Sequence, residues 1–132
     1  MNVIFVYGLL KPGLRLHHVA EPFVVRAAPA TARGRLYDAG SSGASPSDGL
    51  PAARFDEDGD IDGFVLWLDE QRLDDALCIL DELEDEGVDY ERRVIEVMTQ
   101  DGVVDAFAYH WLLPLDGCVH VGRAWPVNEV IE

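Results

Sequence analysis

The chain has 132 residues, of which 48% are hydrophobic, and a mean hydropathy of +0.01, so we expect a single globular domain over residues 1–132. Its formal net charge is −15, which repels phosphate backbones and anionic lipids and therefore argues against nucleic-acid and membrane partners. Cys78 and Cys118 do not make a disulfide framework, and the N-terminus lacks the pattern of a signal peptide, so the expected location is the reducing cytoplasm.

The N-terminal segment predicts a strand followed by an irregular loop. Asn2–Tyr7 is a short apolar run typical of a buried strand. The next residues, up to Gly13, combine glycine and proline, which forces a tight turn and leaves backbone N–H groups without partners. Such a loop can bind an anion through its main chain.

The middle of the chain alternates between short strand-like segments and polar turns. A helical turn is expected at Leu14–Ala20, and a break in the strand pattern at Pro29. The loop Asp38–Leu50 is rich in Gly, Ser, Asp and Pro, and Asp56–Asp60 is predicted to turn a hairpin. The expected strands are Phe23–Arg26, Ala30–Tyr37, Pro51–Phe55 and Ile61–Leu68, the last buried on both faces.

One amphipathic helix follows, with Asp69 as a suitable N-cap and Gly87 as the residue expected to end it. Its apolar residues recur at three- and four-residue spacing, which predicts a stripe facing the core. The residues of this stripe are Leu73, Ala76, Leu77, Leu80 and Leu83.

Glu84 is the acidic residue that falls on this apolar stripe. At about 100° per residue it lies within roughly 20–40° of Leu73, Leu77 and Leu80, while neighbouring acids face solvent. Burial, the negative end of the helix and nearby carboxylates would each raise its pKa, as a general base working near neutral pH requires. A partly exposed Glu at a frayed helix end, or a buried Glu paired with a structural Arg, are the alternatives.

The last third of the chain predicts strands again. Tyr90–Thr99 alternates, Gln100–Gly102 turns a hairpin into Val103–Leu113, and a turn at Pro114–Gly117 leads into a strand at Cys118–Val121. Strands outnumber helices and one strong helix interrupts them. The sequence therefore predicts an α+β fold with a mostly antiparallel sheet curled around or against the helix.

The histidines show no metal-binding spacing. His17 and His18 are adjacent and would point about 100° apart on a helix, and His110 and His120 are isolated in later strands. A cysteine hydrolase that pairs Cys118 with His110 or His120 is disfavoured, because no motif supplies a third, orienting group.

Several short motifs, in this order and spacing, resemble the γ-glutamylcyclotransferase-like family, including its AIG2-like and γ-glutamylamine cyclotransferase branches. The resemblance covers nearly the whole chain. Its motifs are Tyr7-Gly8-x-Leu10-Lys11-Pro12-Gly13, Gly34-Arg35-Leu36-Tyr37 with Gly40, Pro51-Ala52, Leu80-Asp81-x-x-Glu84, Tyr90-x-Arg92, Tyr109 and the Gly122/Trp125 ending.

The resemblance implies a small barrel of mixed, mostly antiparallel strands with one main helix. It implies a small-molecule γ-glutamyl substrate, cyclised to 5-oxoproline with release of an amine, and Glu84 as the catalytic acid and base. The family's loop whose backbone holds the glutamyl carboxylate matches Tyr7, Gly8, Leu9 and Leu10, and an aromatic residue beside the pocket matches Tyr90. The chemistry needs neither a metal nor an organic cofactor, and we expect a monomer or weak homodimer.

Two positions depart from the family's pattern. Leu9 stands where relatives usually have a small hydroxyl residue, and Asp85 and Glu86 precede Gly87, whereas relatives often have glycine directly after the catalytic Glu. A non-catalytic module of the same fold that binds a small molecule or a partner is therefore the alternative. The identity of the leaving amine is open.

Overall fold

The computed structural model describes residues 1–14, 16–39 and 50–125. Its strands are β1 (Val3–Val6), β2 (Val24–Arg33), β3 (Arg35–Asp38), β4 (Pro51–Arg54), β5 (Asp60–Leu68), β6 (Tyr90–Thr99), β7 (Gly102–Trp111) and β8 (Val119–Gly122). Its α-helices are α1 (His17–Ala20) and α2 (Leu73–Leu83), with 3₁₀ turns at Glu21–Phe23 and Glu70–Arg72. Most of the predicted loop at Asp38–Leu50 lies outside the described residues.

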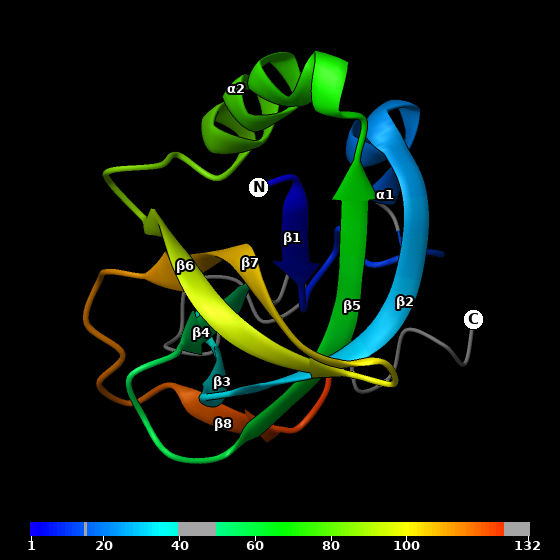
Figure 1. Ribbon diagram of the computed structural model, residues 1–132. Helices are drawn as coiled ribbons and strands as arrows, with labels where there is room; N and C mark the ends of the chain where they lie inside the picture. The colour runs from blue at the N-terminus through cyan, green and yellow to red at the C-terminus, as the bar shows by residue number, and fades with distance from the viewer. Residues whose placement is uncertain (15, 40–49, 126–132) are drawn as a thin grey trace.

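Within the described residues, five strands close a barrel in the order β1-β5-β2-β6-β7 (Figure 1). The β1–β7 contact that closes it is parallel, and the other barrel pairs are antiparallel. Strands β4, β3 and β8 form a second sheet, and α2 lies across one end of the barrel. The prediction of an α+β fold with a mixed, mostly antiparallel barrel and one main helix is confirmed.

Strand β1 is buried on both faces, which explains its uninterrupted apolar sequence. Ile4 and Val6 pack in the core cluster that also contains α2, whereas Val3 and Phe5 pack in a second cluster inside the barrel. Because successive side chains of a strand point to opposite faces, β1 joins the two clusters. The loop that follows β1 therefore starts from one of the most firmly packed parts of the molecule.

The main helix buries Ala76, Leu77 and Leu80, as its stripe predicts, but Leu83 is 39% exposed. That residue lies about 60° further round the helix than Leu80, at the edge of the stripe, and the helix ends there. The prediction that Leu83 faces the core is therefore wrong.

The helix also ends earlier than predicted. Asp85, with φ +54°, takes the left-handed conformation expected of Gly87. Its N–H donates to the Glu82 carbonyl at 3.3 Å, and the Glu86 N–H donates to the Asp81 carbonyl at 2.9 Å, which is a Schellman motif. Asp tolerates this conformation better than most residues.

Strand β2 runs through Pro29 without a break, contrary to the predicted interruption. Pro29 is paired with Phe64 of β5, but β6 pairs with β2 only from Ala30 to Ala32. At Pro29 the strand thus has one neighbour, so a residue without an N–H donor is tolerated at the open edge.

The turn at Asp56–Asp60 does not make the predicted hairpin. Strand β4 pairs with β3, while β5 pairs with β1 and β2, so the turn connects the two sheets. Strand β3 directly follows β2, and β5 follows β4, so the β3–β4 pair lies next to the β2–β5 pair. At the junction between the two pairs, the Gly34 N–H donates to the Gly59 carbonyl at 3.0 Å. The pairing of β5 with β2 and of β4 with β3 is thus determined by contacts between segments far apart in the chain, and not by the Asp56–Asp60 turn.

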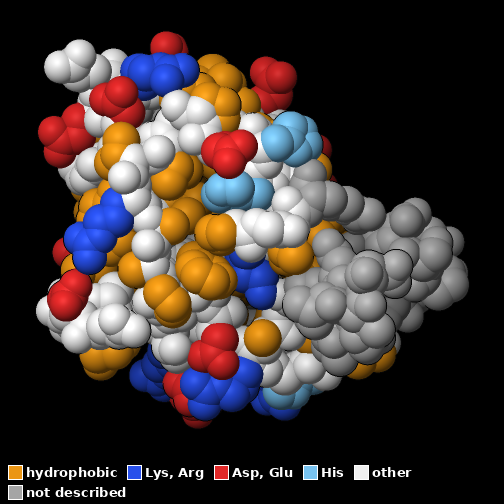
Figure 2. Space-filling view, turned by 90° about the vertical axis from the view of Figure 1, so that its right-hand side faces the viewer, with side chains coloured by type: hydrophobic (Ala, Val, Ile, Leu, Met, Phe, Trp, Pro, Cys, Tyr) orange, Lys and Arg blue, Asp and Glu red, His pale blue; other side chains and the backbone are white. Residues whose placement is uncertain are grey.

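Figure 2 shows the side of the molecule that carries α1 and β2. Hydrophobic side chains gather in the middle of this face, and one residue of β2, Val25, is 67% exposed. On the described part of the face, Asp and Glu side chains are scattered and do not join into one block. None of the helices in the described ranges has the length and apolar content to cross a membrane.

Candidate active site

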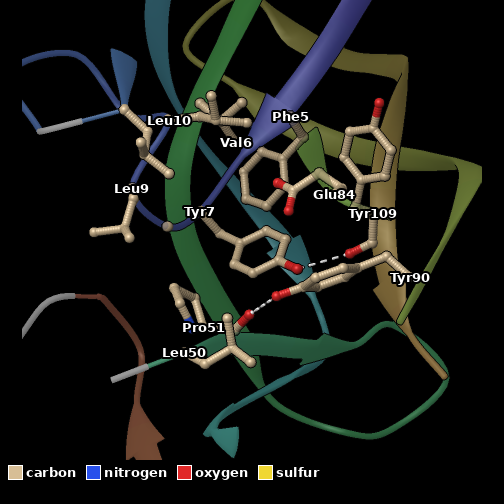
Figure 3. A pocket seen from close by; sticks show the side chains of 12 residues that line it. Phe5, Val6, Tyr7, Leu9, Leu10, Leu50, Pro51, Glu84, Tyr90 and Tyr109 are labelled. Atoms are coloured by element: carbon tan, nitrogen blue, oxygen red, sulfur yellow. Dashed lines mark hydrogen bonds between the residues drawn. The ribbon is translucent and has the colours of Figure 1, made fainter. Parts of the chain in front are cut away.

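A pocket lies where the loop after β1, the C-terminal end of α2 and strands β6 and β7 meet (Figure 3). Its volume is about 70 Å³, enough for roughly five water molecules. The described residues that line it are Phe5, Val6, Tyr7, Gly8, Leu9, Leu10, Leu16, Leu50, Pro51, Glu84, Tyr90 and Tyr109.

Glu84 directly follows the last residue of α2, and its N–H donates to the Leu80 carbonyl at 3.0 Å. In Figure 3 its carboxylate points into the pocket, which Phe5 and Tyr109 also line. Burial raises the pKa of Glu84 to about 7, because an apolar environment disfavours the charged form. At neutral pH this carboxyl group can therefore both accept and return a proton.

Two of the tyrosines in the pocket have their hydroxyl groups fixed by buried hydrogen bonds. The Tyr7 hydroxyl donates to the Tyr109 carbonyl at 2.7 Å, and the Tyr90 hydroxyl donates to the Pro51 carbonyl. Burial raises the pKa of both phenols, so both stay protonated at neutral pH. The Tyr90 ring also packs edge-on against Trp111, with centroids 5.0 Å apart. These rings act as rigid walls of the pocket.

A third tyrosine is held by a charged pair outside the pocket. The Tyr109 hydroxyl donates to Asp81 Oδ1 at 2.6 Å, and Asp81 Oδ2 lies 3.1 Å from Arg92 Nη1. Burial and the Asp81 hydrogen bond both raise the pKa of Tyr109. Because Asp81 faces a guanidinium group, its charge is balanced there, and burial alone accounts for the raised pKa of Glu84.

The loop after β1 is held by its carbonyl groups. The Gly8 carbonyl accepts from the Lys11 N–H at 3.1 Å, and the Leu9 carbonyl accepts from the Leu16 N–H at 3.1 Å. Among the described residues, no backbone hydrogen bond uses the N–H of Gly8, Leu9 or Leu10 as its donor. These donors lie on residues that line the pocket, so the loop has main-chain N–H groups available for an anion.

The structure brings all the sequence-predicted site residues to one pocket: Tyr7, Gly8, Leu9, Leu10, Glu84 and Tyr90. Their roles in binding and catalysis stay predictions. Sequence reasoning missed Phe5, Val6, Leu16, Leu50, Pro51 and Tyr109 as lining residues. For Tyr109 and Pro51 a signal existed, because both stand in the motifs on which the family resemblance rests. Nothing in the sequence marked Leu16 or Leu50.

The histidines and cysteines show no arrangement for chemistry. His110 is buried, and its Nδ1 accepts a hydrogen bond from the Phe55 N–H at 3.2 Å, as expected of a packing histidine. Cys118 Sγ lies 3.9 Å from the Ala39 carbonyl, and Cys78 is exposed. In the described part of the chain, no three His, Cys, Asp or Glu side chains lie together as metal ligands would.

Titration with sulfate is expected to shift the amide NMR signals of Gly8, Leu9 and Leu10, since their N–H groups would bind the anion. Leu9→Ala should leave this response nearly unchanged, because the main chain makes the contact. The amide of Gly117, in the turn before β8, is the internal control. Shifts confined to regions other than the β1 loop would contradict the assignment of an anion site there.

Comparison with known proteins assigns the chain to a family. Residues 4–125 match the protein family described as gamma-glutamyl cyclotransferase, AIG2-like. The chain belongs to this family. Members of the gamma-glutamyl cyclotransferase family are generally enzymes, and the match covers every described residue of the pocket.

Solved structures with the same fold include YkqA from Bacillus subtilis, with 25% identity and a TM-score of 0.66 over 98% of this chain. This chain spans only 41% of YkqA. A mouse AIG2-like protein matches along its length: 25% identity, a TM-score of 0.63 and 96% of each chain covered.

More distant similarity extends to Kluyveromyces lactis allophanate hydrolase, at 18% identity and a TM-score of 0.66. The match covers 98% of this chain but 21% of that enzyme, and it shows a shared fold alone. No curated protein sequence matches the chain significantly.

Proposed function

We propose that this protein converts a γ-glutamyl amine or γ-glutamyl amino acid to 5-oxoproline and a free amine, with Glu84 as general acid and base. The observation that carries the proposal is the partly buried Glu84 carboxyl group, whose pKa is raised to about 7, in the same pocket as the loop residues Gly8, Leu9 and Leu10. Membership of the gamma-glutamyl cyclotransferase family supports the same reaction.

The reaction is an internal acyl transfer. Glu84 accepts a proton from the substrate's α-ammonium group, and the resulting amine attacks the γ-carbonyl carbon. This closes a five-membered ring and gives a tetrahedral intermediate. The bond to the leaving nitrogen then breaks as Glu84 returns the proton to that nitrogen. The ring nitrogen still carries a second proton at this point; Glu84 accepts it as the lactam forms and passes it to the released amine, which leaves as an ammonium ion. One carboxyl group thus moves two protons in turn, and it ends the cycle deprotonated, as it began.

The β1 loop would supply orientation. Backbone N–H groups of Gly8, Leu9 and Leu10 can hold the substrate's α-carboxylate, and the pocket then keeps the γ-carbonyl folded back toward the α-amine. Well-oriented intramolecular reactions reach effective concentrations of roughly 10⁵–10⁸ M, so positioning supplies a large part of the rate. The rigid β1 strand and the bonded carbonyl groups of the loop support such positioning.

The tyrosines do not replace Glu84 as the base. Each has a pKa raised by burial, and each hydroxyl donates its proton to an oxygen within the protein. Their contribution is an apolar, water-poor wall. That wall is also what keeps the pKa of Glu84 high.

The test is product analysis for 5-oxoproline over a panel of γ-glutamyl compounds that includes amino acids, polyamines and alkylamines. Release of 5-oxoproline together with the free amine is the expected result. A non-catalytic module of the same fold would bind some of these compounds and release 5-oxoproline from none, and that outcome would overturn the proposal.

The pH dependence follows from the same carboxyl group. In the free enzyme Glu84 must be deprotonated to act as a base, so kcat/KM is expected to rise with pH through a pKa of about 7. Steady-state rates from pH 3.5 to pH 8.5 check this. A rise centred near the usual Glu value of 4.5 would show that Glu84 is not buried in the working enzyme.

A further inference from the structure

The lining of the pocket divides into an inner and an outer part. The aromatic rings around Glu84 are buried: Phe5 is 1% exposed, Tyr90 5% and Tyr109 2%. By contrast, Leu9 and Leu16 are half-buried, and Leu50 is 38% exposed. In Figure 3, Leu9 and Leu50 lie on the side of the pocket away from Glu84 and Tyr109. We call Leu9, Leu16 and Leu50 the outer leucines.

The proposed chemistry places the reacting groups of the substrate in the inner part of the pocket and the leaving amine in the outer part. The α-ammonium group must lie at Glu84, and the α-carboxylate lies at the loop N–H groups. The group on the leaving nitrogen does not take part in ring closure, so it must extend from the γ-carbonyl toward solvent. The route to solvent passes the exposed part of the lining, where the outer leucines lie.

We infer that the leaving amine carries an apolar side chain, which packs against Leu9, Leu16 and Leu50. This inference rests on the proposed function and specifies its substrate class as γ-glutamyl amides of apolar primary amines. Leu9 is central to it, because its half-buried isobutyl group lines the pocket beside the loop N–H groups. Each buried methylene of the amine would gain binding free energy from contact with these side chains.

Charged leaving groups fit this part of the pocket less well. Among the described lining residues, Glu84 is the only side chain charged at neutral pH, and the substrate ammonium already faces it. A carboxylate on the leaving group would meet neither a Lys nor an Arg in that lining, and a second ammonium would meet no further acid. Within the described lining, either charge would lose water against leucine without a partner.

Three amides of equal length separate the possibilities. They are γ-glutamyl pentylamide, γ-glutamyl 4-aminobutylamide and γ-glutamyl 4-aminobutyrate, whose leaving groups end in a methyl, an ammonium and a carboxylate group. We expect kcat/KM for the pentylamide to exceed that for each charged analogue by tenfold or more. From methylamide to pentylamide, kcat/KM should rise about threefold to fourfold with each methylene.

Matched variants tie the preference to the outer leucines. Leu50→Ser should lower the ratio of kcat/KM for pentylamide to kcat/KM for methylamide about threefold or more. Leu112→Ser, at a leucine that is 39% exposed and outside the pocket lining, should keep the wild-type ratio. Measuring a ratio within one variant cancels any general loss of folded enzyme.

Each outcome has one meaning. A preference for the ammonium or carboxylate analogue, equal rates for all three, or an unchanged ratio in Leu50→Ser would overturn the inference and leave the proposed function standing. No 5-oxoproline from these amides, but release from γ-glutamyl amino acids or polyamines of the wider panel, would overturn this inference alone. No 5-oxoproline from any compound of either set would overturn the proposed function and this inference with it.

Discussion

Glu84→Gln is expected to lower the rate of 5-oxoproline release by about 10²- to 10⁴-fold, the usual contribution of general acid–base catalysis. Gln keeps the size and polarity of Glu but cannot accept the proton of the substrate ammonium. The fold and the binding of 5-oxoproline should be largely kept. Steady-state kinetics, a circular dichroism spectrum and a binding titration with 5-oxoproline check these three points.

Glu82→Gln is the matched control. Glu82 is exposed, lies in α2 two residues before Glu84, and does not line the pocket. Its substitution removes the same charge and should leave turnover at the wild-type level. If wild type and Glu84→Gln release 5-oxoproline equally fast, Glu84 is not the base and the proposed mechanism is wrong.

The Glu84→Gln substitution should also change how stability depends on pH. The carboxyl group has a pKa of about 7 in the folded protein and about 4.5 when unperturbed, so the folded state binds its proton more tightly. The contribution of this carboxyl group to the free energy of unfolding is favourable below pH 4.5 and is lost as pH rises through 7. The reason is that the unfolded chain binds fewer protons than the folded protein between these two pH values. At pH 8 the variant should be more stable than wild type by roughly 2–3 kcal/mol.

At pH 4 the same comparison should show little difference, because Glu84 is protonated in both states. Urea unfolding at the two pH values measures both free energies. An equal effect of Glu84→Gln at pH 4 and pH 8 would mean that the carboxyl group titrates normally in the folded protein. A stabilised but inactive variant is the expected trade between a functional site and stability.

Gly63→Ala is expected to give the largest loss of stability, about 3 kcal/mol in the free energy of unfolding. Gly63 lies in β5 beside the end of β1, where an added Cβ would lie 2.3 Å from the Val6 carbonyl oxygen and 2.9 Å from the Phe5 ring. A backbone oxygen in a closed barrel cannot move away as a flexible side chain can, so β1 must shift. Thermal unfolding should show a melting temperature about 10 °C lower.

The shift of β1 should also reduce turnover, since the loop that follows this strand supplies the proposed anion site. Gly117→Ala is the comparison. Gly117 has φ +78°, and an added Cβ would meet nothing within 4 Å, so its cost is backbone strain of about 1 kcal/mol. Equal destabilisation by the two substitutions would show that the close approach of Gly63 to β1 does not determine stability.

Much of the site could be predicted because its signals are local in the chain. The angle between Glu84 and Leu80 depends only on helical geometry, so the sequence by itself determined which acid faces the pocket. The β6–β7 hairpin is likewise local, because a short turn at Gln100–Gly102 joins two strands that pair over their full length. The β1 strand and its loop were recognised from consecutive residues alone.

The tertiary structure decided what depends on distant partners. Pro29 is tolerated within a strand because β6 leaves that edge of β2 open. The Asp56–Asp60 turn joins two sheets because β4 pairs with β3, whereas β5 pairs with β1 and β2. Leu50 reaches the pocket through packing that no local pattern encodes. A strand's partners are chosen by contacts between segments far apart in the chain, and a window of neighbouring residues does not contain that information.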